Sequence, residues 1–249
     1  MKDIIQGKSL PDGLSNIQNG LADIEHNMLH FLDNHDEQRL ASPEFAGSPQ
    51  KGMPLMVFST TISTSPTMIY FGQEVGEAAN ENAGFGTRSR TSIFDYIGVP
   101  NHQRWMNNGK FDGGQLSREE KDLRDFYKRL LNFSITSSAL TGSFQEIQTL
   151  NRKSTAGYDP GIYAFTRWSE VEKLIIVTNF SWVAASKFEL KVPSDIIRKW
   201  RLKDGNYTLT DQLYKRNSVQ LVVLFCDVKY FFLFVFFFSF IFLLFFYFL

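Results

Sequence analysis

Helical patterns alternate with short apolar runs in the first 71 residues, and this alternation restricts the fold more than any other feature. Residues 13–27 carry apolar side chains at helical spacing, and the apolar run Met28–Leu32 follows. A second helical pattern covers Pro49–Ser65 and leads into the apolar run Thr67–Phe71. This order is typical of a parallel βαβ unit: helix, buried strand, helix and buried strand, with short loops between them.

Capping residues mark two of the predicted helices. Ser48 is a good N-cap, and Pro49 fits the first helical position after it. Ser117–Glu120 (SREE) has the pattern of a capping box, and apolar residues at helical spacing follow it. The long loop between the second strand and this last helix, Gln73–Gln115, is rich in Gly, Asn and aromatic residues. Loops of that length in compact domains are usually functional or disordered, and the interleaved aromatic residues favour function.

After Gly142 the apolar period changes from helical spacing to alternation, which predicts a small antiparallel β-domain over residues 141–223. The candidate strands lie near Phe144–Thr149, Ile162–Arg167, Leu174–Asn179, Phe188–Val192 and Tyr207–Thr210. We expect the domain to lack its last strands, because a different kind of sequence begins at residue 224. The fold class predicted from the pattern is therefore α/β followed by all-β.

Residues 224–249 form a Phe-rich tail. Tyr230–Leu249 is 20 residues long and carries no charge. As a helix it would span about 30 Å, the thickness of a bilayer's hydrocarbon core. One interpretation is a single-pass C-terminal membrane anchor, with Lys215, Arg216 and Lys229 on the cytoplasmic side. The alternative is out-of-frame or read-through sequence, because packed membrane helices use more Gly, Ala and Ser than this tract contains.

The overall composition excludes some classes of function. The formal net charge is zero, so the chain lacks the basic footprint of a nucleic-acid-binding protein. The single cysteine, Cys226, cannot form an intrachain disulfide. The N-terminus has no apolar run behind Lys2, so no signal peptide is expected, and the protein would be soluble without the tail.

The most informative motif is Phe31–Arg39 (FLDNHDEQR), where polar residues follow the first apolar run. A His-Asp pair at a strand end can present a hydrogen-bond donor and a carboxylate on one concave face. Cleavage of a glycosidic bond passes through an oxocarbenium-like state that a fixed carboxylate stabilises. The dipeptide alone is a weak signal, since a strand-end His or Asp more often caps a loop.

The wider context strengthens this interpretation, because the sequence resembles the alpha-amylase family of glycoside hydrolases. The segment FLDNHD is similar to the family's fourth signature region, and TMIYFGQEVG resembles its eighth barrel strand and the following turn. RTSIFDY and HQRWMNNGKFDGG fit the bacterial alpha-amylase-like members. The resemblance covers residues 13–215. It implies that residues 1–140 are the end of a catalytic TIM barrel, its last two β/α units, and that residues 141–223 are an incomplete β-sandwich.

The resemblance also implies roles for individual residues. Asp36 corresponds to the family's transition-state stabiliser, and His35 to the histidine that binds sugar hydroxyls. Asn34 and Arg39 would support the motif, with Arg39 either pairing with Asp33 or Asp36 or lying in solvent. Three further residues have a functional and a structural interpretation. Glu74 would be either catalytic or a structural residue at the barrel rim. Trp105 and Phe85 would either stack on sugar rings or anchor the loop.

Two of the three family carboxylates have no counterpart. A retaining glycosidase needs a nucleophile and a general acid about 5 Å apart. The family's nucleophile lies in a Gly-x-Arg-x-Asp pattern, which this sequence lacks. None of the acids before Asp36 has the required strand-end setting, and a complete barrel takes about 250 residues. We therefore expect a fragment of an enzyme acting on α-1,4-glucosidic bonds of starch, glycogen or maltooligosaccharides, and we expect it to be inactive alone.

Other interpretations remain open at this level. The family includes transglycosylating members, such as branching and trehalose-forming enzymes, and loops decide between water and a sugar as acceptor. A non-catalytic, membrane-anchored protein with an amylase-like domain is a further alternative. Some members bind calcium through Asp, Asn and backbone oxygens. Glu77–Asn82 offers such residue types, but no spacing in the sequence identifies a metal site.

Overall fold

The computed structural model describes residues 1–80, 88–91, 99–181, 188–215 and 218–223, together with the backbone of residues 230–235 and 241–246. The chain divides into two compact units. The first unit comprises Met1–Ser9, Asn27–Thr60 and Ser65–Asn132, and the second comprises Leu10–His26, Thr61–Thr64 and Phe133–Leu249.

Helices and loops make up most of the first unit. Its elements are α1 (Lys2–Ile5), α3 (Pro49–Thr61), the 3-10 turns η2 (Gln73–Val75) and η3 (Asn107–Gly109), α4 (Pro100–Met106) and most of α5 (Arg118–Thr136). Gln73 connects the two longest helices, because its Nε2 lies 3.1 Å from Tyr127 Oη on α5 and 3.2 Å from Met56 Sδ on α3. Leu55, Met56 and Phe126 are almost fully buried, which places the apolar core of this unit between α3 and α5.

The two predicted caps are confirmed. Ser48 Oγ accepts a hydrogen bond from the backbone N–H of Lys51 at 3.3 Å, at the start of α3. At the start of α5, the backbone N–H of Glu120 donates to Ser117 Oγ at 3.2 Å, and the Ser117 N–H donates to Glu120 Oε2 at 2.8 Å. This reciprocal pair is the capping box that the SREE pattern predicts.

Removing the α5 cap is expected to lower stability measurably. Ser117→Ala leaves the N–H of Glu120 without its side-chain acceptor, and the loss of such a cap costs about 1 kcal/mol. Thermal unfolding should show a lower midpoint for Ser117→Ala and an unchanged midpoint for Ser9→Ala, which removes the hydroxyl of an exposed serine outside any helix. Equal midpoints for the two variants would mean that the box does not stabilise α5.

The two segments predicted as buried strands form only one β-bridge. Met28–Leu32 and Thr67–Phe71 share a single parallel bridge, between His30 and Thr67. The His30 N–H donates to Pro66 O at 2.9 Å, and the Met68 N–H donates to His30 O at 2.8 Å. The parallel direction agrees with the βαβ order, but the prediction of two full strands is wrong. Met28, Leu29 and Phe31 are 37%, 49% and 41% exposed, because the described residues provide no further strand to cover them.

The helix predicted over residues 13–27 is also shorter than expected. The helix α2 covers Gly13–Gly20, and the 3-10 turn η1 (Glu25–Asn27) comes after a stretch of turns. Gly20 is a poor helix former, and the next residues leave the helix at this point. This helix belongs to the second unit, where Ser15 Oγ lies 2.9 Å from Tyr163 Oη and Asp12 Oδ1 accepts a hydrogen bond from Arg152 at 2.9 Å.

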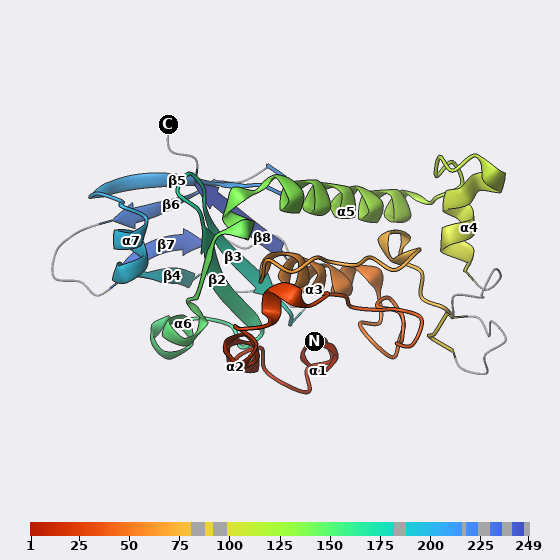
Figure 1. Cartoon of the computed structure of the whole chain (residues 1–249), viewed down its shortest axis with the longest axis horizontal. Coiled ribbons are helices and arrows are strands. Elements are labelled where there is room, and N and C mark those ends of the chain that lie inside the picture. The colour runs from red at the N-terminus through yellow and green to blue at the C-terminus, as the bar shows by residue number, and fades with distance from the viewer. Residues whose placement is uncertain are drawn as a thin grey trace. The chain divides into compact units, whose positions relative to one another are not determined.

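An eight-stranded antiparallel sheet organises the second unit (Figure 1). The strands are β1 (Ser143–Glu146), β2 (Ile162–Trp168), β3 (Lys173–Asn179), β4 (Phe188–Pro193), β5 (Gly205–Asp211), β6 (Ser218–Val223), β7 (Tyr230–Val235) and β8 (Ile241–Phe246). Their order across the sheet is β1-β2-β3-β8-β5-β6-β7-β4. Two short helices, α6 (Gln148–Ser154) and α7 (Ser194–Lys199), interrupt the run of strands, and the sequence pattern did not predict either.

The core of the second unit follows the alternation in the sequence. Every second residue of β4 is buried, namely Phe188, Leu190 and Val192, whereas Glu189 on the same strand is exposed. Apolar side chains of β2, β3 and α7 join this cluster. The prediction of an antiparallel β-domain is therefore confirmed, and the arrangement of its strands in two stacked layers stays a prediction.

The Phe-rich tail is not the predicted 20-residue helix. Tyr230–Val235 and Ile241–Phe246 are strands, and each pairs over six residues, β7 with β4 and β8 with β3. No helix in the described part of the chain is long and apolar enough to cross a membrane. The error has a physical cause, because an uncharged apolar run has no periodicity that separates a helix from a strand, while Phe, Ile, Val and Tyr favour strands. Two further strands therefore join the sheet after residue 223, and the expectation that the β-domain is incomplete stays a prediction.

Candidate functional site

The His-Asp motif lies in a loop that follows the bridge at His30. Residues 33–39 form no helix or strand, so side-chain hydrogen bonds fix their backbone. Asn34 Oδ1 accepts hydrogen bonds from the backbone N–H groups of Asp36, at 2.7 Å, and Glu37, at 3.0 Å. An Asn side chain that binds backbone two and three residues ahead stabilises a tight turn. Asn34 therefore holds the backbone that carries Asp36.

The side chains of Arg39 and Asp33 are fully buried and anchor this loop. Arg39 Nε lies 3.5 Å from Asp33 Oδ2, and the same oxygen accepts a hydrogen bond from the Leu40 N–H at 2.8 Å. Asp33 Oδ1 is buried and has no hydrogen-bond partner in the part of the chain that the structure describes. Burial raises the pKa of Asp33, and the positive charge of Arg39 offsets part of that rise. The structure thus decides between the predicted partners of Arg39: it pairs with Asp33.

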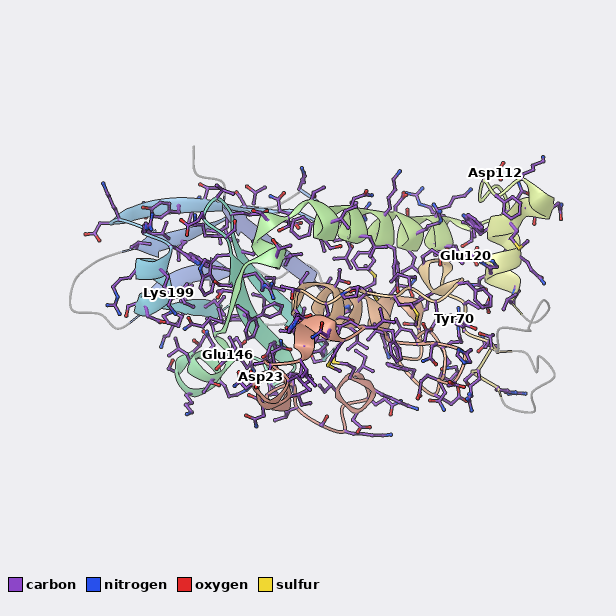
Figure 2. All side chains as sticks on the ribbon, viewed as in Figure 1. Asp23, Tyr70, Asp112, Glu120, Glu146 and Lys199 are labelled. Atoms are coloured by element: carbon purple, nitrogen blue, oxygen red, sulfur yellow. The ribbon has the colours of Figure 1, made fainter. Side chains whose placement is uncertain are left out.

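The guanidinium of Arg39 connects this loop to distant parts of the first unit. It donates hydrogen bonds to Phe71 O and, at 3.2 Å, to Thr91 Oγ1. Its Cζ lies 4.7 Å from the centre of the Tyr70 ring, which Figure 2 labels. The Arg39 backbone N–H also donates to Ser89 O at 2.6 Å. One buried side chain therefore fixes the motif loop relative to the segment that follows the bridge at Thr67.

His35 and Asp36 are the exposed part of the motif. His35 Nε2 lies 3.3 Å from Asp36 Oδ2, and the side chains of the two residues are 49% and 71% exposed. On the other side of the carboxylate, Arg90 lies 4.0 Å from Asp36 Oδ1 and is 40% exposed. Sequence reasoning gave Arg90 no role at the site, although this residue, 54 positions after Asp36, begins the segment RTSIFDY that carries part of the family resemblance. The carboxylate of Asp36 is thus open to solvent and lies between the nitrogen donors of His35 and Arg90.

The other residues singled out from the sequence lie apart from this carboxylate or outside the description. Trp105 packs in an aromatic group, 5.6 Å from the His102 ring and 5.9 Å from the Phe111 ring between centres. Its role as a loop anchor is the one this packing favours. Glu74 is half-buried in η2. The proposed stacking platform Phe85 lies outside the described residues.

Of the acidic and amide residues considered for calcium in Glu77–Asn82, Glu81 and Asn82 lie outside the described residues, and Glu77 has other partners. Both carboxylate oxygens of Glu77 accept hydrogen bonds from backbone N–H groups: Oε1 from Ala79 at 3.3 Å, and Oε2 from Asn101 at 3.0 Å and His102 at 3.4 Å. Those oxygens hold the start of α4. Among the described residues, no group of three His, Cys, Asp or Glu side chains is arranged to hold a metal ion.

Comparison with solved structures places this geometry in a known architecture. A maltogenic alpha-amylase from Thermotoga neapolitana matches 99% of the chain with a TM-score of 0.65 at 15% sequence identity. An Anoxybacillus alpha-amylase matches 96% of it with a TM-score of 0.59 at 16% identity, and the alpha-amylase from H. orenii matches 98% with a TM-score of 0.56 at 17% identity. The chain is similar in structure to bacterial alpha-amylases.

The likeness has a defined extent. The chain spans less than half of each of these three proteins, 48%, 43% and 46% of their lengths. No protein-family model matches the sequence. No curated protein matches it either. At these identities the likeness establishes a shared fold alone.

Proposed function

We propose that this chain is part of an alpha-amylase-type retaining glycoside hydrolase acting on α-1,4-linked glucose chains. In this proposal residues 1–140 contribute the last two β/α units of a (β/α)8 barrel, and the β-domain follows them. Asp36 supplies the carboxylate that stabilises the oxocarbenium-like transition state, and His35 donates hydrogen bonds to sugar hydroxyls. The membrane anchor is not part of the proposal, since the tail forms strands.

One observation carries this proposal. The exposed His35–Asp36 pair sits on a turn held by Asn34 and by the buried Asp33–Arg39 pair, within a chain that shares its fold with alpha-amylases. A solvent-open carboxylate on a turn that buried neighbours hold in place is positioned for a ligand that develops positive charge. The substrate class agrees with the neighbours, because AmyP was solved with maltotriose and the Geobacillus thermoleovorans alpha-amylase with acarbose.

The isolated chain should bind sugar without cleaving it. Retaining hydrolysis needs a nucleophile and an acid on opposite sides of the bond, about 5 Å apart. In this chain the carboxylate nearest to Asp36 in sequence on the N-terminal side is Asp33, which is buried against Arg39 and unavailable to substrate. Asp36 alone stabilises charge and cannot form the covalent intermediate.

A titration with maltotriose, followed through the backbone amide NMR signals, tests this assignment. The signals of residues 35–37 should shift, and Asp36→Asn should weaken the binding about tenfold, because hydrogen bonds to a charged group are among the stronger ones. Asp125→Asn, which neutralises an exposed carboxylate on α5, is the matched control and should bind normally. No reducing sugar should be released from maltotriose by the chain.

Two results would contradict the proposal in different ways. If maltotriose leaves the signals of residues 35–37 in place, or if Asp36→Asn binds as well as the control, the sugar-site assignment is wrong. If the purified chain releases reducing sugar and Asp36→Asn abolishes the release, the assignment survives but the predicted inactivity is wrong.

A further inference from the structure

Five side chains of the first unit form a continuous series of contacts with His102 at its centre. In order, they are Arg39, Phe71, His102, Trp105 and Arg124. The centre of the His102 ring lies 5.1 Å from that of Phe71 and 5.6 Å from that of Trp105. Arg39 Cζ lies 5.3 Å from the centre of the Phe71 ring. Arg124 Cζ lies 5.4 Å from the centre of the Trp105 ring, so each aromatic neighbour of His102 already contacts a guanidinium group.

This series joins α4 to the anchor of the motif loop, residues 33–39. Phe71 O accepts a hydrogen bond from Arg39, and Arg39 pairs with Asp33 to hold that loop. The backbone between Arg39 and α4 is closely packed, because a Cβ atom added at Gly72 would lie 3.2 Å from Arg39 Nη2 and 3.3 Å from His102 Cβ. His102 therefore lies close to the buried cation that fixes the motif loop.

The surroundings of the His102 imidazole favour its neutral form. The charged form carries a proton on both ring nitrogens. Nδ1 is buried and has no hydrogen-bond partner among the described residues, so its proton would lack an acceptor. Burial lowers the pKa of His102; the carboxylates of Glu74 and Glu77 oppose this shift, and the positive charge of Arg39 adds to it. Because the pKa is lower when α4 is in place, a conformation that exposes the imidazole binds the proton more tightly.

The two arginines of the series oppose a further positive charge at His102. An aromatic ring attracts a cation, so the two rings alone would favour a charged imidazole. Arg39 and Arg124 already make that contact with these rings, and like charges close together repel. Arg104, the other basic residue of α4, is paired with Glu120, which Figure 2 labels. The series therefore accommodates a protonated imidazole less well than a neutral one.

We propose that His102 is a pH-sensitive latch for α4. The neutral imidazole packs on Phe71 and Trp105 and holds α4 next to the motif loop. The protonated imidazole leaves the two rings for solvent, and α4 loosens from the anchor of that loop. The latch is closed above the pKa of free histidine, about 6.5, and weakens as the pH falls below that value. It makes the packing beside Arg39 depend on pH whether or not a sugar is bound.

Amide hydrogen exchange and NMR titration of the native chain measure the latch. The Gln103 N–H donates to Val99 O at 2.9 Å, so it exchanges when α4 opens. Its protection factor, which corrects for the direct effect of pH on exchange, should fall several-fold between pH 8 and pH 5. Proton binding by a free imidazole limits this fall to about thirtyfold. The Cε1–H signal of His102 should titrate with a midpoint below about 6.5, and the indole N–H signal of Trp105 should move with the same midpoint.

Two variants identify the histidine responsible. His102→Phe keeps an aromatic ring against Phe71 and Trp105 but cannot bind a proton, so its Gln103 protection factor should stay constant over the same range. His26→Gln, which removes an exposed imidazole from the second unit, is the matched control and should behave like the native chain. The thermal unfolding midpoint of each variant at pH 8 verifies folding.

The latch is disproved if the protection factor of the native chain does not fall between pH 8 and pH 5, or if it falls equally in His102→Phe. A His102 midpoint above about 6.5 also overturns the proposal, because the protonated imidazole would then be the form that holds α4. This midpoint is measured on the native chain, so it decides the question even if His102→Phe does not fold. None of these measurements uses a sugar, and their outcome is separate from that of the maltotriose titration.

Discussion

A chain that ends at Val223 is expected to lose the cooperative unfolding of its second unit. In the described sheet, β8 is the strand between β3 and β5, and β7 is the strand between β6 and β4. Deleting both strands leaves three separate pieces: β1-β2-β3, the β5–β6 hairpin and β4 without a neighbour. A two-stranded hairpin is marginal by itself, and unpaired strand edges promote aggregation.

Chemical denaturation followed by circular dichroism measures this effect. The native chain should show one cooperative transition for the β-unit, and the truncated chain should show none or should be recovered only as aggregate. A chain that ends at Phe246 keeps both β7 and β8 and is the control, which should unfold like the native chain. A truncated chain with an unchanged β-unit transition would mean that the tail is not part of the sheet.

Arg39→Ala is expected to destabilise the first unit by about 3–5 kcal/mol at neutral pH, the cost of removing one partner of a buried ion pair. Asp33 would then be buried with no compensating charge, because Arg39 is its ion-pair partner at 3.5 Å. The substitution also removes the donors to Phe71 O and Thr91 Oγ1. The free energy of unfolding, measured by urea denaturation, checks the size of the effect.

The pH dependence of this loss tests its cause. Burial raises the pKa of Asp33 above the value it has in the unfolded chain, so the folded state binds the proton more tightly. Such a group costs stability as pH rises above its unfolded pKa of about 4, and this cost disappears below that value. Without Arg39 the pKa rises further, so the deficit of Arg39→Ala should shrink as the pH falls towards 4.

A double variant separates the charge from the lost packing. Asp33→Asn in the Arg39→Ala background removes the buried negative charge and should recover part of the stability at pH 7. The stability that the double variant still lacks relative to the native chain should depend little on pH. Arg118→Ala is the matched control, because Arg118 is 89% exposed and its ion pair with Asp122 is on the surface. If the stability loss of Arg39→Ala stays constant from pH 7 to pH 4, the buried charge of Asp33 is not the source of that loss.

The sequence predicted those parts of the fold whose signals are local. The capping box at Ser117 involves residues three positions apart, and α5 begins where it predicts. Alternation along β2, β3 and β4 identified strands within one or two residues of their observed ends. These predictions succeed because the capping groups are neighbours in the chain, and because a short apolar run bounded by turn residues, or the alternation seen in β4, is also a local signal.

The candidate site was predicted in part, again according to how local each contact is. Asn34, His35 and Asp36 are consecutive, so one motif identifies them, and the turn around Asn34 is formed within that motif. Arg90 could not be found in this way, since it reaches Asp36 from a distant part of the chain.

The sequence by itself determined the apolar alternation, the caps and the presence of a single His-Asp motif. The tertiary structure decided which pairings those segments make. An uncharged run of Phe, Leu and Ile is compatible with a helix or a strand, and only the free edges of β3 and β4 select the strand. Arg39 is compatible with solvent or with two different carboxylates, and only the burial of Asp33 decides its partner. In both cases the deciding free energy comes from groups far apart in the chain, which no local pattern records.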